Sequence, residues 1–164
     1  MKLQGIKGQA GLSLPEVMTA VVLLSGFFAS VFELNAVCLR YIDATKESVA
    51  ALQSVQDRCE VLRNLAFTDL TNPSHVSNLM ASPANPSDFL KKATEVVRIR
   101  AFPTANGVTQ FTRSPGGAVT TDSTATDLGT GLVQVEVINS WNMTLGGRAR
   151  SEQVTTIISN GTKK

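Results

Sequence analysis

The sequence predicts an α+β protein in which a long N-terminal helix packs on a small antiparallel β-sheet head. Two observations predict this class. Residues 12–38 form an apolar run. Residues 39–67, which follow it, contain no Gly or Pro, and their apolar residues are three and four positions apart, as on one face of a helix. Near the C-terminus, Val133, Val135 and Val137 alternate with polar residues, which is typical of a half-buried strand.

The apolar run is long enough to cross a membrane. As a helix, residues 12–38 would extend about 40 Å at 1.5 Å per residue, against a bilayer core of about 30 Å. Lys2 and Lys7 precede the run with no acid among residues 1–11, so we expect this end to stay in the cytoplasm. A cleaved secretory signal is the main competitor, but such signals end in a small-x-small site, which residues 32–36 (FELNA) fit poorly.

Charge outside this basic start is balanced. The whole chain has 15 Lys and Arg against 13 Asp and Glu. Without Lys2 and Lys7, the two counts are equal, so we expect no direct nucleic-acid binding.

Pro15 and Glu16 stand at the start of the apolar run. Proline is tolerated in the first turn of a helix, where its missing N–H has no partner to lose, so the helix is expected to begin near Leu12. A charge such as Glu16 within hydrocarbon is costly unless it is paired. The carboxylate therefore needs either a partner or a position near the water interface.

These residues resemble the N-terminal signal of type IV pilins and type II secretion pseudopilins. A basic leader ends at Gly11, a hydrophobic Leu12 follows, and Glu16 is the fifth residue after the glycine, ahead of the apolar helix. The resemblance covers residues 1–38 closely. It implies that a prepilin peptidase cuts between Gly11 and Leu12 and that the new Leu12 amine is methylated.

The resemblance also implies a role for Glu16. In such assemblies the glutamate attracts the N-terminal amine of a neighbouring subunit, and a buried ion pair of this kind acts mainly as a specificity device. The competing interpretation is that Glu16 lies at the water interface, near a helix N-terminus that favours negative charge. One departure is Glu33, which stands where many major pilins carry a second proline. It argues against a major pilin, and we expect Glu33 to be a surface residue at the outer interface.

Residues 39–67 are expected to form the amphipathic half of the helix. One stripe contains Val49, Leu52, Val55, Cys59, Leu62 and either Leu65 or Ala66. The charged residues, including Asp57, Arg58 and Glu60, fall mainly off this stripe and are expected to be solvated. Cys38 and Cys59 would lie about 31 Å apart on one helix, too far for a disulfide, so both are expected to be packing residues.

Residues 68–164 are expected to form a loop- and strand-rich head. Residues 68–87 contain Pro73, Pro83 and Pro86 and predict a long loop with at most a short helical turn. Residues 95–102 and 108–113 predict a hairpin, and residues 114–131 predict an exposed loop. Residues 132–141 and 148–159 predict strands joined by a turn at Gly146 and Gly147, a pair that also resembles the C-terminal hairpin of minor pilins and pseudopilins.

Residues that could support catalysis or metal binding are sparse. His75 is the only histidine and has no cysteine or carboxylate cluster near it in the sequence, so neither a zinc site nor a His-based triad is expected. Asp122 and Asp127 lack the carboxylate density of a calcium loop. We therefore expect no enzymatic activity, no cofactor and no metal.

The sequence thus predicts a leader (residues 1–11), a membrane and assembly segment (12–38), an amphipathic helix (39–67) and a head (68–164). The expected function is that of a structural subunit of a pilus or secretion pseudopilus. Its expected partners are a prepilin peptidase, other pilin or pseudopilin subunits, an inner-membrane assembly platform and the lipid bilayer. The precursor is expected in the bacterial inner membrane with a cytoplasmic N-terminus, and the assembled chain in a periplasmic or extracellular fibre. The alternatives are an extracytoplasmic binding module on an uncleaved single-span anchor and, third, a secreted enzyme.

Overall fold

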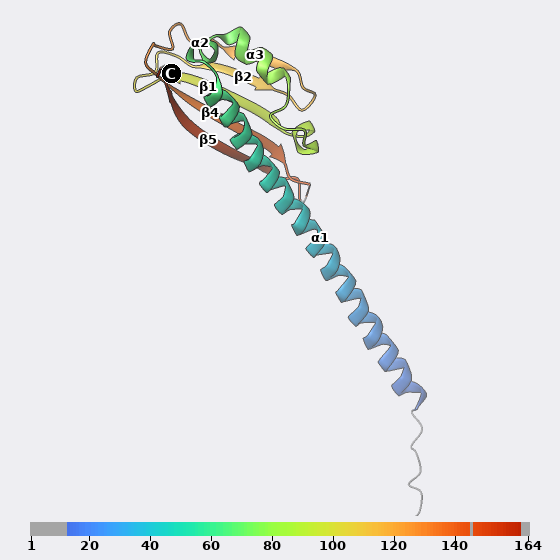
Figure 1. Cartoon of the computed structure of the whole chain (residues 1–164). Helices are drawn as coiled ribbons and strands as arrows, with labels where there is room; N and C mark the ends of the chain where they lie inside the picture. Colours follow the sequence, from blue (N-terminus) through green and yellow to red (C-terminus); the bar gives the residue numbers. More distant parts are fainter. Residues whose placement is uncertain (1–12, 145, 162–164) are drawn as a thin grey trace, which may run out of the picture. The chain divides into compact units, whose positions relative to one another are not determined.

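The computed structural model describes residues 13–144 and 146–161 and has the predicted α+β architecture (Figure 1). The chain divides into two compact units, Met1–Tyr41 and Ile42–Lys164, and the boundary falls inside the first helix. The elements, in chain order, are α1 (Leu14–Asn64), α2 (Phe67–Leu70), α3 (Pro73–Ala81), the 3₁₀ helix η1 (Asp88–Lys91), β1 (Thr94–Ala101), β2 (Thr109–Arg113), β3 (Val119–Ser123), β4 (Leu132–Asn142) and β5 (Ala149–Ser159).

Both ends of α1 follow from local chemistry. The Ser13 carbonyl accepts hydrogen bonds from the N–H groups of Glu16 and Val17 at 3.0 and 3.2 Å, and Pro15 lies in the first turn, where no N–H is required. The helix ends at Asn64, so the predicted end at residue 67 is wrong by about one turn. The Leu65 N–H bonds back three residues to the Leu62 carbonyl at 3.3 Å, a tightening common at helix ends.

The head contains one antiparallel sheet of five strands in the order β3-β2-β1-β4-β5. Both predicted hairpins are present. In β1, Val97 pairs with Phe111 of β2 on one side and with Val137 of β4 on the other. Gly146 and Gly147, between β4 and β5, both have positive φ (76° and 62°), a conformation that favours glycine and suits a tight hairpin.

Two segments predicted as loops contain regular structure. Residues 68–87 include α3, whose first turn is capped by the Asn72 side chain, which accepts hydrogen bonds from the N–H groups of Ser74 and His75 at 3.0 and 3.4 Å. His75 therefore lies on a helix and not in a loop. Residues 114–131 include the edge strand β3, which is largely exposed and so shows no apolar alternation in its sequence.

The core lies on one face of the sheet. Buried apolar side chains from the C-terminal part of α1, from α3 and from the strands β1, β2 and β4 meet there, and together they bring both helices to the same face (Figure 1). The buried members are Val55, Cys59, Leu62, Leu70, Val76, Met80, Val97, Ile99, Phe111, Leu128, Val133, Val135 and Val137. The opposite face is polar and includes Arg98, which donates to Gln110 at 2.8 Å and to Glu136 at 3.3 Å. One covered face and one solvated face are typical of antiparallel sheets.

The buried stripe of α1 differs from the predicted one at its N-terminal end. Val55, Cys59 and Leu62 are buried as expected, but Val49 and Leu52 are 60% and 44% exposed. The residues that α1 buries are Ala44, Ala51, Ser54, Val55, Arg58, Cys59 and Leu62. At this end the facing surface is bulky, because the rings of Phe89 and Trp141 meet edge to face 5.2 Å apart. The small Ala51 packs in this cluster, which leaves Leu52 on another side of the helix.

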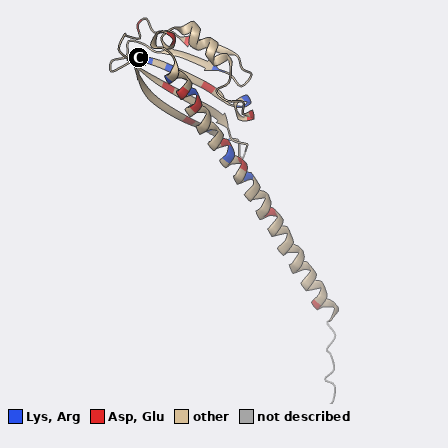
Figure 2. Ribbon diagram, in the orientation of Figure 1, with Lys and Arg blue, Asp and Glu red and all other residues tan. Residues whose placement is uncertain are grey.

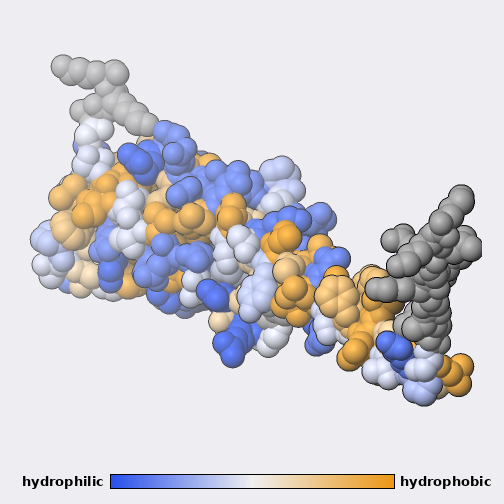
Figure 3. Space-filling view, turned by 90° about the horizontal axis from the view of Figure 1, so that it is seen from below, coloured by the Kyte–Doolittle hydropathy of each residue, from blue (hydrophilic) through white to orange (hydrophobic). Residues whose placement is uncertain are grey.

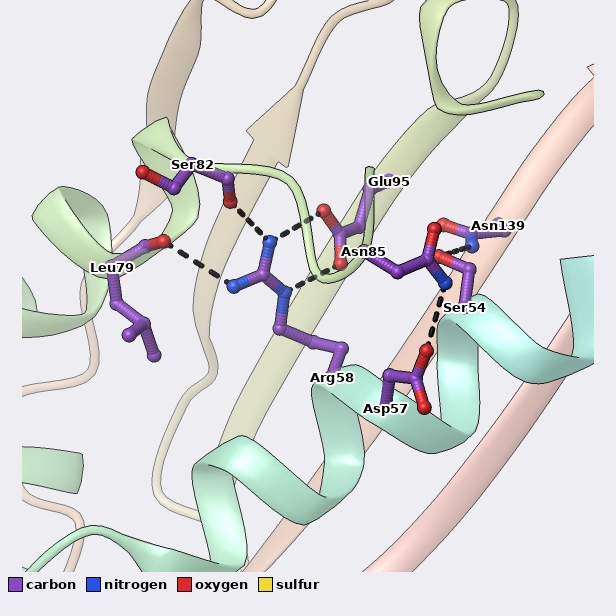
Figure 4. A network of polar contacts seen from close by, with 8 residues as sticks. All are labelled: Ser54, Asp57, Arg58, Leu79, Ser82, Asn85, Glu95 and Asn139. Atoms are coloured by element: carbon purple, nitrogen blue, oxygen red, sulfur yellow. Dashed lines mark hydrogen bonds and ion pairs between the residues drawn. The ribbon is translucent and has the colours of Figure 1, made fainter. Parts of the chain in front are cut away.

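A buried ion pair joins α1 to β1 (Figure 4). The Arg58 Nε donates to Glu95 Oε1 at 2.7 Å, and Nη2 donates to Oε2 at 3.1 Å. The same guanidinium donates to the carbonyls of Leu79 and Ser82 at 3.3 and 2.7 Å, at the end of α3. The prediction that Arg58 is solvated is therefore wrong. In the core, both oxygens of the Glu95 carboxylate and two carbonyls at the end of α3 accept hydrogen bonds from its guanidinium.

Candidate functional site

The N-terminal part of α1 exposes a long row of apolar side chains. They are Leu14, Val17, Met18, Val21, Val22, Leu23, Leu24, Phe27, Phe28, Val31, Phe32, Leu34 and Val37, each at least 37% exposed. We call residues 14–38 the apolar segment. Apolar surface colours much of this part of the helix in Figure 3, and charged residues are sparse along it in Figure 2. So much exposed apolar surface marks a membrane or protein contact.

Hydroxyl groups inside the apolar segment are satisfied within the helix itself. Thr19, Ser25 and Ser30 donate to the carbonyls four residues earlier at 2.8, 2.7 and 3.0 Å. Such bonds remove the cost of exposing a free hydroxyl to hydrocarbon. The segment is therefore compatible with an apolar environment despite its three hydroxyls.

Among the described residues, α1 is the one helix whose length and apolar composition would allow it to cross a membrane. Signal sequences and the core helices of soluble proteins can meet the same criteria. A core helix is mostly buried, whereas none of the most apolar stretch of α1 is buried. A membrane or a protein partner is therefore the simplest cover for this surface.

Glu16 lies in the first turn of α1, with an exposed side chain. No ion pair joins it to another residue of the described ranges 13–144 and 146–161. The N-terminal end of a helix favours a negative charge, but this effect is modest and falls off within the first turn. Gly11 and Leu12, the predicted processing residues, lie outside the described residues.

The head carries an open groove between α1 and β5. Its volume is about 470 Å³, and it is lined by Gln56, Cys59, Glu60, Arg63, Val154, Thr155 and Thr156. Cys59 is the only nucleophilic thiol there, and burial raises its pKa. A raised pKa disfavours the reactive thiolate, so the groove lacks an activated cysteine nucleophile.

The remaining candidate ligands are used structurally or are dispersed. The Asp122 carboxylate accepts hydrogen bonds from Gln110, Thr112 and Thr120, and Asp127 accepts one from the N–H of Gly129 at 2.7 Å. Within the part of the chain that the structure describes, no three His, Cys, Asp or Glu side chains come together to hold a metal ion.

Both cysteines are free, as their separation on one helix predicts. Cys59 is a core packing residue. Cys38 is exposed, and no other described element of this chain covers it, so its expected packing role is not met within the chain itself.

Sequence reasoning missed the buried polar contacts of the head. Arg58 follows Val55 by three residues and precedes Leu62 by four, which is helical core spacing, and Glu95 is in phase with Val97 and Ile99 along β1. Their spacing predicts that both positions are buried, but nothing in the sequence indicates which acidic residue forms an ion pair with which basic one. Ser54 and Asn139 likewise meet in the core, where the Asn139 side chain donates to the Ser54 hydroxyl at 3.0 Å (Figure 4).

Comparison of the chain with protein-family models, curated proteins and solved structures finds no match. Glu16 and the apolar segment are therefore the features of the chain from which its function can be inferred.

Proposed function

We propose that the chain is a structural subunit of a type IV pilus or type II secretion pseudopilus, cut by a prepilin peptidase after Gly11 and assembled through its N-terminal helix. The observation that carries this proposal is the position of Glu16. It is a carboxylate with no ion-pair partner among the described residues. It lies in the first turn of a helix whose residues 17–32 present only apolar side chains, one glycine and three internally bonded hydroxyls.

The apolar segment needs cover in every state of the protein. Each Å² of apolar surface removed from water contributes about 25 cal/mol, so thirteen exposed large side chains strongly favour a lipid or protein environment. In the precursor the bilayer supplies that cover. In a fibre the same side chains pack between the helices of neighbouring subunits.

Cleavage gives Glu16 its partner. Cutting the bond between Gly11 and Leu12 creates a cationic amine four residues before Glu16. An amine from a neighbouring copy can approach this carboxylate from the side. Once water is excluded, an unpaired Glu16 carboxylate costs several kcal/mol. A neighbour whose axial position brings its Leu12 amine to this carboxylate is therefore favoured over one at another position.

Processing provides the first test. The full chain and a Gly11→Leu variant are expressed with a prepilin peptidase, and membrane fractions are analysed by intact-mass spectrometry. We expect a mature wild-type chain beginning at Leu12 and an uncut variant, because the peptidase needs a small residue before the cut. Gly8→Leu, three residues earlier, is the matched control and should be cut normally. An uncut wild-type chain would favour the alternative of a binding module on a single-span anchor, and a mature N-terminus near Val37 would establish ordinary signal cleavage.

A further inference from the structure

Two opposite charges lie on one face of α1 at the end of the apolar segment. Seven residues complete nearly two helical turns, so positions seven residues apart lie on one side of a helix. On α1, one such set is Thr19, Gly26, Glu33 and Arg40. We call them the heptad face. Glu33 and Arg40 are both exposed and lie about 10 Å apart along the helix axis at 1.5 Å per residue.

Neither charge has a partner in its own helix. Salt bridges along a helix join residues three or four apart, and those positions around Glu33 hold only Ala, Ser and Val. Arg40 has Asp43 three residues later, but Lys46 lies 3.7 Å from that carboxylate. Among the described residues, no ion pair involves Glu33 or Arg40.

We propose that the heptad face is a contact between copies of this chain, in which Glu33 of one copy pairs with Arg40 of the next. This inference rests on the proposed function, which places copies side by side with their N-termini in the same direction. The chemistry that selects the occupant is charge complementarity: a second copy is the partner that carries both the missing cation and the missing anion at this spacing.

The charge pattern also selects an axial offset. Parallel copies in register would place Glu33 against Glu33 and Arg40 against Arg40, and both contacts are repulsive. Moving one copy along the axis toward its C-terminus brings its Glu33 toward Arg40 of the neighbour. The same two residues therefore disfavour the unshifted pair and favour the shifted one.

This offset agrees in direction with the one that Glu16 requires. Pairing Glu16 with the Leu12 amine of a neighbour shifts that neighbour by four residues, about 6 Å, toward the C-terminus. The shifted copy's Glu33 is then level with position 37 of the first copy, about 4.5 Å below Arg40. Side chains on a helix point toward its N-terminus, so Arg40 leans toward the Glu33 that it would meet.

A shifted contact leaves one free charge at each end. The first copy then has an unmatched Glu33 and the second an unmatched Arg40, so the contact is heterologous. Heterologous contacts form rings where the rotation closes and open assemblies where it does not. Gly26 allows close approach along the face, because it has no side chain and no other described part of the chain lies within 4 Å of the position that a Cβ would take.

Charge reversal in trans tests the pair. Two full-length copies with different epitope tags are expressed together with a prepilin peptidase, crosslinked with formaldehyde in the membrane and purified through one tag. The recovered amount of the other tag reports association. Glu33→Arg makes the face wholly positive and Arg40→Glu makes it wholly negative. Lys92→Glu is the matched control, since it makes the same charge change as Arg40→Glu at an exposed position of the head, away from α1.

We expect Glu33→Arg with itself, and Arg40→Glu with itself, to lose about tenfold in recovery, because each interface then opposes like charges. Glu33→Arg mixed with Arg40→Glu should return to within about threefold of wild type, since both alternating contacts become attractive. Lys92→Glu should stay at the wild-type level. The Glu33–Arg40 pair would be overturned if neither reversal changed the association, or if the mixed variants associated no better than the single ones. Either result would leave the proposed function standing. Wild-type copies that are uncut and do not associate would overturn the proposed function together with this inference.

Discussion

Arg58 shows how a charged residue can hold three elements together. Its guanidinium bonds to Glu95 on β1 and to two carbonyls at the end of α3, and both charged side chains are at most 2% exposed. A buried ion pair can contribute little to the free energy of unfolding, but removing one partner leaves the other charge unpaired in the core. We therefore interpret the pair as a device that specifies how α3 docks on α1 and β1.

Replacing Arg58 with Met should lower the free energy of unfolding by about 3–5 kcal/mol, because Glu95 and the two carbonyls lose their donor. Replacing both charged residues, Arg58→Met with Glu95→Leu, should recover most of that loss. The measurement is urea unfolding of residues 40–164, with Lys46→Met as a control at an exposed ion pair. A loss below about 1 kcal/mol for the single variant would show that the pair does not hold the head together.

Asp122 should make the β2–β3 hairpin sensitive to acid. Hydrogen bonds from Thr112, Gln110 and Thr120 lower the pKa of this carboxyl. A lowered folded-state pKa means that the stabilisation is present above the ordinary value of about 4 and is lost as the pH falls through the lower folded-state value. The difference in melting temperature between wild type and Asp122→Asn should therefore be largest near neutral pH and shrink below about pH 4. An unchanged difference down to about pH 2.5 would contradict this role.

At the scale of elements, α3 depends on its first turn. Asn72 caps two backbone N–H groups and Pro73 sets the first helical residue, which together start a helix of nine residues. Asn72→Ala should lower the free energy of unfolding by about 1 kcal/mol, whereas Asn72→Asp, which keeps the acceptor, should stay near wild type. Denaturation of the two variants side by side is the measurement, and equal losses would show that the cap oxygen is not what starts the helix.

The same element shows what sequence reasoning could and could not reach. The strands β1, β2 and β4 were predictable because their buried face alternates with a polar one. In β5 the alternation is between half-buried and exposed residues, and the Gly146–Gly147 turn before it supported the prediction. The Asn72-Pro73 start of α3 is present in the sequence, but residues 68–87 are rich in Asn, Ser and Pro, and that composition predicts a loop. β3 could not be found from apolar alternation, since its side chains are mostly exposed and its place depends on pairing with β2.

For the candidate site, the sequence located Glu16 and the apolar segment, because both are local patterns. The structure adds that the hydroxyls of the segment are bonded internally and that Glu16 has no ion-pair partner among the described residues. The contacts of Arg58 were beyond sequence reasoning, since they join residues far apart in the chain whose meeting depends on the packing of α1, α3 and β1.

At the scale of the whole molecule, the apolar segment and the head should be separable. The head has its own core and lies within the unit Ile42–Lys164, whereas most of the exposed large apolar side chains lie before that unit in the sequence. Residues 40–164 alone should therefore be soluble and monomeric, with both helix and strand signals in circular dichroism. Sedimentation velocity at micromolar concentration is the companion measurement, and a tight oligomer would show that the head itself drives association.

The most direct test of the proposed function concerns Glu16 in assembled fibres. Wild type and Glu16→Val are compared in the native host at matched precursor levels, and the fraction of mature chain recovered in sheared fibres is measured. If the carboxylate pairs with the Leu12 amine of a neighbour, Glu16→Val should be cut and inserted normally, since it removes a charge from the apolar segment, but should enter fibres at a strongly reduced level. Equal incorporation of the two chains would contradict the account, because a glutamate that only lies at the water interface predicts no assembly defect.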